Sequence, residues 1–171
     1  NNVRYRSGHI TYSSFKNALF EKVDFICVNM KNSKFKGTKF KNCLFFGCDL
    51  QDADFFGTSF ENVYFISYNL KNIKNFMVND NIKIIKKYPE ILLSQEMKGV
   101  LAAMSQNSKL EKYHILTINQ KKPNYWMLEI LLKKYHEQEL KYFFQKLLIT
   151  NKQQYYTIHD YILALSNYYK R

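Results

Sequence analysis

The chain has 171 residues, of which 46% are hydrophobic and 17% aromatic, so it can bury a substantial core and is not a disordered segment. Its net charge of +12 comes almost wholly from lysine, because Arg4, Arg6 and Arg171 are the only arginines. Acidic partners are favoured, but lysine lacks the planar fork that reads phosphates and base edges, which argues against specific nucleic-acid binding.

Two further classes are excluded by the same inspection. No run reaches the roughly 18 apolar residues that a membrane span needs. The three cysteines, Cys27, Cys43 and Cys48, form no C-x-x-C pair and have no histidine at metal-ligand spacing, so we expect neither a disulfide framework nor a metal or cofactor site. The chain starts at Asn1 rather than at Met, from which we expect it to be a processed product or part of a longer protein.

A strict five-residue period occupies residues 2–72. The repeat centres are large and apolar: Tyr5, Ile10, Phe15, Phe20, Phe25, Met30, Phe35, Phe40, Phe45, Leu50, Phe55, Phe60, Phe65 and Leu70. Two residues before each centre the side chain is small or β-branched, from Val3 to Val63, and only Tyr68 departs from this rule. Helices repeat every three to four residues and half-buried strands every two, so this period predicts a coil with a corner every five residues.

This pattern closely resembles the pentapeptide-repeat family, whose members carry a large apolar residue at the repeat centre and a small one two positions earlier. The resemblance implies a β-solenoid, a right-handed quadrilateral β-helix with four five-residue faces per coil and both of those positions inward. About three and a half coils would then occupy residues 2–72. With strands about 4.8 Å apart, they would form a rod of roughly 15 Å. Cys43 and Cys48 fall in the small inward register and are expected to be buried.

Two sets of outward residues depart from a plain solvated surface. The residues that follow the centres of the third face are Ile26, Phe46 and Ile66, with Leu44 and Tyr64 beside them, and such an apolar stripe on the outside marks a contact surface. Either the C-terminal helices or a partner protein can cover it. The middle coil carries an outward group of lysines, which is a second candidate for partner binding or else a solubilising face: Lys31, Lys34, Lys36, Lys39 and Lys41.

After Leu70 the period fails, since Asn75 occupies a centre position, and from about Asn79 apolar residues take helical spacing. Residues 73–171 are therefore predicted to be an α-helical domain that caps the solenoid or packs on it. The expected helices span Pro89–Ser105, Ser108–Thr117, Asn124–Tyr135, Glu139–Ile149 and Thr157–Tyr169. Helices this short do not persist alone in water, so they must pack on one another or on the end of the solenoid.

No catalytic site emerges from the sequence, and we assign no catalytic residue. His9, His114, His136 and His159 have no nucleophile beside them, and the adjacent pair His159 and Asp160 would point about 100° apart on a helix. Glycines 37, 47 and 57 suit corners rather than a phosphate-binding loop. An enzyme in its own right is thus the least supported class.

The favoured function is a non-catalytic protein–protein interaction module. The order of parts is similar to the amino-terminal portion of bacterial HECT-like ubiquitin ligases, secreted effectors in which a β-helix precedes helical lobes. That resemblance implies a host protein as the partner, action inside the host cell, and a ligase cysteine outside this chain, because none follows Cys48. Without it, the bacterial cytoplasm is the expected location.

The alternative is a topoisomerase-binding protein of the quinolone-resistance type, which mimics DNA and needs a strongly negative rod. Residues 1–74 contain eleven Lys or Arg against six Asp or Glu, a net charge of +5. The sign opposes this alternative.

Overall fold

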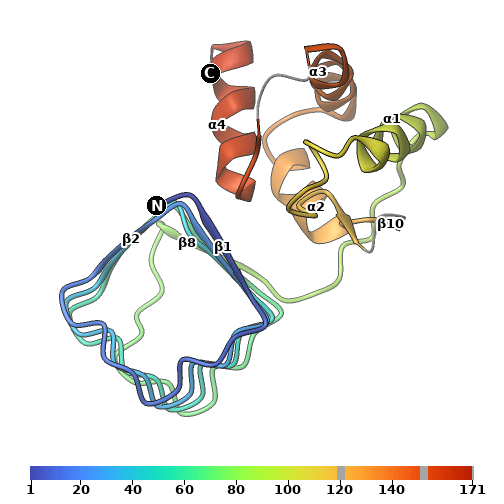
Figure 1. Cartoon of the computed structure of the whole chain (residues 1–171). Coiled ribbons are helices and arrows are strands. Elements are labelled where there is room, and N and C mark those ends of the chain that lie inside the picture. Colours follow the sequence, from blue (N-terminus) through green and yellow to red (C-terminus); the bar gives the residue numbers. More distant parts are fainter. Residues whose placement is uncertain (119–121, 151–153, 171) are drawn as a thin grey trace. The chain divides into compact units, whose positions relative to one another are not determined.

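The computed structural model describes residues 1–118, 122–150 and 154–170. The chain divides into two compact units, Asn1–Lys87 and Tyr88–Arg171. The first unit is a β-solenoid, and the second carries four α-helices within its described residues (Figure 1). None of the described helices is long and apolar enough to cross a membrane.

The solenoid has four faces, as the five-residue period predicts. Its third face is a parallel sheet of β1 (Val3–Arg6), β3 (Val23–Ile26), β5 (Leu44–Phe46), β7 (Val63–Ile66) and β8 (Ile82–Ile85), in that order. The second face is a parallel sheet of β2 (Leu19–Glu21), β4 (Lys39–Lys41) and β6 (Ser59–Glu61). Single bridges connect the coils on the other two faces, and each joins residues 20 apart, such as Ser14 with Lys34 and Asp49 with Asn69. Stacked coils of four sides result (Figure 1).

Phenylalanine rings stack coil upon coil in the solenoid core. The ring of Phe45 lies 5.0 Å from that of Phe25 and 4.6 Å from that of Phe65, centroid to centroid. Inward serines and threonines are accommodated because they bond backbone carbonyls of the coil before: Thr38 donates to the Phe15 carbonyl at 2.6 Å and Thr58 to the Phe35 carbonyl at 2.7 Å. Their hydroxyls are thus satisfied inside an apolar core.

Each corner needs a residue in the left-handed backbone region. Asn17, Asn32 and Asn42 have φ values of 58°, 58° and 53°, and Gly37, Gly47 and Gly57 have values of 64–65°. Asparagine and glycine tolerate this region better than other residues do. The corners therefore explain why asparagine recurs through this half of the chain.

The end of the solenoid differs from the prediction. We expected residues after about Asn79 to be helical, but Ile82–Ile85 form β8, which pairs with β7 at an offset of 19 rather than 20 residues. Between β7 and β8 the chain follows the fourth and first faces, bypasses the second face and crosses the interior (Figure 1). There Phe76 packs 5.1 Å from Phe65, centroid to centroid. The first compact unit consequently runs to Lys87, whereas the period alone ends at 72.

The helical unit contains α1 (Gln95–Gln106), α2 (Tyr125–Leu132), α3 (Glu137–Thr150) and α4 (Ile158–Tyr169), with an antiparallel pair of short strands, β9 (Thr117–Ile118) and β10 (Lys122–Pro123). The last three helices lie where they were predicted. The first begins after the Ser94 cap rather than at Pro89, because the Ser94 side chain accepts the Met97 N–H at 3.1 Å.

The helix predicted at 108–117 is wrong. Apart from its end at Thr117 in β9, that segment forms turns and irregular backbone around the buried carboxylate of Glu111. Oε1 of Glu111 lies 2.6 Å from Nδ1 of His114 and accepts the hydroxyl of Thr117. The Asn124 amide adds a bond to the Ile115 carbonyl at 3.1 Å. These local bonds hold the segment in a non-helical shape.

Candidate interaction surfaces

The apolar stripe consists of Ile26, Leu44, Phe46, Tyr64 and Ile66, and the parallel register of β3, β5 and β7 brings these residues into two adjacent rows. Phe46 pairs with both Ile26 and Ile66 in one row, and Leu44 pairs with Tyr64 in the other. Leu44 and Ile66 are fully buried, Ile26 and Tyr64 nearly so, and Phe46 is half-buried. Burial also raises the pKa of the Tyr64 phenol.

Strand β8 extends both rows by a residue that the sequence reasoning missed. Ile85 lies beside Ile66, and Lys83 lies beside Tyr64 with its ammonium 5.2 Å from the ring centroid. Both were missed because this part of the chain was expected to be helical. The signal was present as a β-branched run, Ile-Lys-Ile-Ile, displaced by one residue from the five-residue period.

At the other end of the stripe, the row that contains Leu44 and Tyr64 continues with a charged residue. Asp24 occupies the same position in β3, and its carboxylate accepts a hydrogen bond of 3.0 Å from Nη1 of Arg4 in β1. Both side chains are buried. The stripe is therefore bounded along its row by a paired charge, which fixes where the apolar contact surface ends.

The five middle-coil lysines do not gather into one basic patch. Lys31 pairs with Asp49 at 3.0 Å and Lys41 with Glu61 at 2.9 Å, each with the next coil. The pKa of Lys41 is raised by its hydrogen bond to Glu61 and by the charge of that carboxylate. Lys36 lies over the ring of Phe56, 5.3 Å from its centroid. Exposed Lys34 and Lys39 remain, on the first and second faces.

The cysteines lie where the repeat register places them. Cys43 and Cys48 are buried, and burial raises the pKa of each thiol to about 12. The Cys48 thiol lies 3.3 Å from the Phe25 carbonyl. Cys27 is exposed at a corner. Among the described residues no group of three His, Cys, Asp or Glu side chains is arranged to hold a metal ion.

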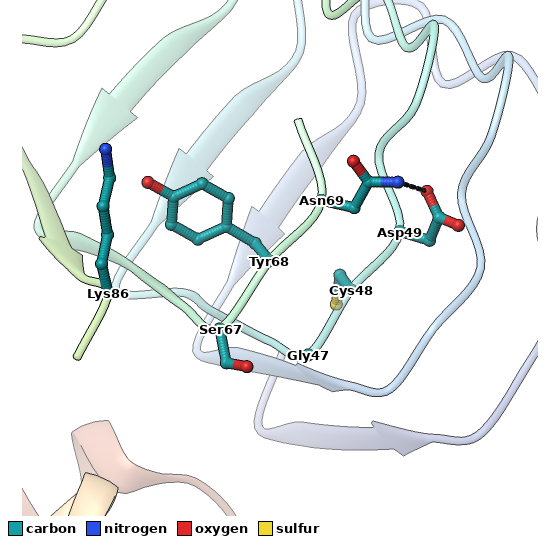
Figure 2. A pocket seen from close by; sticks show the side chains of 7 residues that line it. All are labelled: Gly47, Cys48, Asp49, Ser67, Tyr68, Asn69 and Lys86. Carbon is teal, nitrogen blue, oxygen red and sulfur yellow. Dashed lines mark hydrogen bonds between the residues drawn. The ribbon is translucent and has the colours of Figure 1, made fainter. Parts of the chain in front are cut away.

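A cleft of about 550 Å³ opens at the last complete coil, where the third face turns into the fourth (Figure 2). Its lining residues come from two successive coils and from the chain just after β8: Gly47, Cys48, Asp49, Ser67, Tyr68, Asn69 and Lys86. The Asn69 amide donates to the Asp49 carboxylate at 3.0 Å. Tyr68 replaces the small inward residue of every earlier repeat, and its ring stands edge-on to that of Phe65.

Comparison with known proteins identifies the repeat. The family model for pentapeptide repeats matches residues 9–42 and 24–62, with 8 copies of the repeat. A pentapeptide repeat protein from the thylakoid lumen of Arabidopsis thaliana is 19% identical over 56% of this chain and 74% of that one, with a TM-score of 0.38. Another, from the cyanobacterium Cyanothece 51142, is 11% identical over 48% and 60% of the two chains, with a TM-score of 0.19. None of the curated proteins matches the sequence.

Proposed function

Because residues 9–62 are a pentapeptide-repeat solenoid, and such proteins are generally non-catalytic interaction modules, we propose that this chain binds another protein surface through its apolar stripe. One observation supports the proposal above all. Five large apolar side chains occupy outward positions on successive strands of a single face. At equivalent positions β4 and β6 of the second face carry polar residues instead, namely Lys39, Lys41, Ser59 and Glu61. Phe46 is half-buried and the other four are buried, and a contiguous set of outward apolar side chains is characteristic of a contact site.

The geometry suits a broad, rigid contact. Parallel strands hold the side chains of the two rows at fixed spacing, so little side-chain freedom is lost when a partner surface packs on them. Half-buried Phe46 supplies aromatic area, which is enriched at interface centres. The Arg4–Asp24 pair at one end restricts the contact to partners that leave this pair intact.

Two occupants of the stripe are open, the helical unit of the chain itself or a separate protein, and Phe46→Asp separates them. If the helical unit occupies the stripe, the variant should unfold several degrees below the parent chain, because a carboxylate then replaces an apolar contact. If a separate protein occupies the stripe, the melting temperature of the variant should equal that of the parent chain, and the variant should fail to capture that protein. A destabilised variant would assign the stripe to a contact within the chain and overturn its role in partner binding, and a variant that is equally stable and still binds would contradict the proposal as well.

The matched control is Phe56→Asp. Phe56 follows its repeat centre as Phe46 does, but it lies on the first face and is 55% exposed. The same substitution there removes only the contact with Lys36. It should therefore leave both the melting temperature and partner capture unaltered. Equal effects of the two substitutions would show that a new carboxylate, not the stripe, causes the change.

The lysines are proposed to contribute a weaker, long-range attraction. Since Lys31 and Lys41 are already paired within the solenoid and Lys36 lies over the ring of Phe56, the charge available to an acidic partner belongs mainly to Lys34 and Lys39. Replacing these two by Glu should slow association, and the difference from the parent should shrink as salt screens it. A salt-independent association rate would assign the lysines to solubility alone.

We also propose the narrower assignment, that the module is the recognition part of a secreted bacterial effector of the HECT-like ubiquitin-ligase type with a host protein as partner. Its support is the order of the two units, a solenoid followed by helices. No cysteine follows Cys48, so transfer chemistry would need a further part. The reading frame after Arg171 provides the test: a following lobe with a cysteine would support it, and a stop codon there would refute it.

A further inference from the structure

The fourth face of the solenoid has a regular backbone pattern that stops at its last coil. In each earlier coil the repeat centre and the residue two positions later donate their N–H groups to the next coil. Leu50 donates to the Asn69 carbonyl at 2.9 Å and Asp52 to the Lys71 carbonyl at 3.0 Å. In return, the Asn69 N–H donates to the Cys48 carbonyl at 3.0 Å. Each rung, meaning the five-residue segment that one coil contributes to this face, therefore bonds the next coil through two backbone N–H donors and one carbonyl acceptor.

The last coil presents the same three groups without a following rung. By the same register they are the N–H groups of Leu70 and Asn72 and the carbonyl of Tyr68, and no partner for them occurs in the described part of the chain. Strand β8 does not supply one, because it follows the third face only as far as Ile85, whose carbonyl accepts the Ser67 N–H. An open edge of this kind is a template for an added strand.

The cleft lies beside this open edge (Figure 2). Tyr68 and Lys86 lie on one side of it, with the phenol oxygen turned toward the Lys86 side, and the bonded pair of Asn69 and Asp49 lies on the other. Its volume of about 550 Å³ admits one or two side chains of an added segment.

Charge distinguishes this end of the solenoid. Residues 67–87 contain five lysines, Lys71, Lys74, Lys83, Lys86 and Lys87, against one acidic residue, Asp80, a net charge of +4. Lys71 lies in the open rung, between Leu70 and Asn72, and Lys86 lines the cleft; both are exposed. A segment bound here would therefore be favoured if it carried carboxylates.

We propose that this edge binds an extended acidic peptide segment of another protein, which adds to the fourth face as its next rung. Its backbone accepts from Leu70 and Asn72 and donates to Tyr68, one side chain enters the cleft, and its carboxylates face Lys71 and Lys86. Backbone pairing gives such binding its affinity and the pocket gives it selectivity. The site is separate from the apolar stripe and goes beyond the function proposed for it.

The test is amide hydrogen exchange on the whole chain with a capped peptide of alternating Glu and Val, about eight residues long, as the probe. Without peptide, the amides of Leu70 and Asn72 should exchange faster than those of Leu50 and Asp52, which are already bonded. Saturating peptide should slow exchange at Leu70 and Asn72 by about tenfold or more and leave Leu50 and Asp52 unchanged. Unchanged exchange at Leu70 and Asn72 would overturn the proposal.

Two control peptides and a pair of variants test the acidic specificity and the backbone pairing separately. A Lys and Val peptide that protects equally would refute the acidic specificity, and an N-methylated Glu and Val peptide that protects equally would refute backbone pairing. Lys86→Glu should weaken binding about fivefold, whereas Lys16→Glu, at an exposed lysine of the first coil, should not. Equal losses would show that only net charge matters. Because Phe46→Asp tests the stripe independently, either surface can fail without the other.

Discussion

The two units of this chain reach a packed core by opposite routes. In the solenoid one rule, repeated every five residues, places Phe on Phe and a small residue beside each ring, and the inward polar groups are hydroxyls bonded to the previous coil. In the helical unit the core mixes Tyr135, Tyr155 and Tyr161 with the buried charge of Glu111. The first core is specified by period, the second by individual contacts.

This difference predicts where substitutions act. A solenoid core residue contacts the coils before and after it, so a change is transmitted along the stack. A polar group of the helical core has its own set of partners, and a change there acts on that set.

Phe45→Ala is the strongest test of the stack. Phe45 is fully buried between the rings of Phe25 and Phe65, so its truncation should lower the free energy of unfolding by about 3–5 kcal/mol. Urea denaturation measures the loss. Phe15→Ala removes a half-buried ring of the first coil and should cost clearly less. Equal costs would contradict the idea that stacking on both sides supports the core.

Asn32→Val tests the corners, which among the described residues recur at a fixed interval only in the solenoid. Asn32 has φ 58°, where a β-branched residue is strained, so the substitution should cost about 1–2 kcal/mol. Asn32→Gly should be tolerated. Lys34→Val, an exposed change two residues later outside the corner, should have little effect on the denaturation midpoint. A Gly variant as unstable as the Val variant would show that the amide of Asn32, not its backbone, is needed.

The same contrast explains what the sequence predicted. The Phe columns, the four faces and the stripe all follow from one period, so they were predicted residue by residue. Ion pairs between coils could also have been predicted, because Arg4 and Asp24 are 20 residues apart and share a column, as do Lys41 and Glu61. Treating the lysines as one outward group missed this pairing, which neutralises part of the middle coil.

Other features depended on contacts that no periodicity reveals. Strand β8 follows a 19-residue offset after the chain crosses the interior at Phe76, so the shift could not be located by counting. The segment at 108–117 has apolar residues at helical spacing, but Glu111, His114 and Thr117 bond one another instead. The open rung at Leu70 is evident only once the course of the chain after Ile85 is known.

The smallest expected effect is a pH dependence that distinguishes the ion pairs of the two units. In the helical unit Lys141 donates to Glu96 and, by that bond and then by its charge, lowers the pKa of this carboxyl below its ordinary 4.5. A carboxyl with a lowered folded-state pKa stabilises the fold above its unfolded pKa, and the contribution disappears as pH falls through the folded value. Because Glu96 is exposed, the effect is small.

Lys141→Met keeps an apolar stem at a buried position and removes the charge. Its deficit in melting temperature against the parent should therefore be largest near neutral pH and shrink below about pH 4. Lys41→Met removes the solenoid pair with Glu61, where the raised pKa belongs to the lysine, so that contribution disappears only as pH rises through the raised value. Between about pH 3 and pH 7 the Lys141 variant should thus show the steeper change. A deficit that stays constant over this range would mean that Lys141 acts through packing alone.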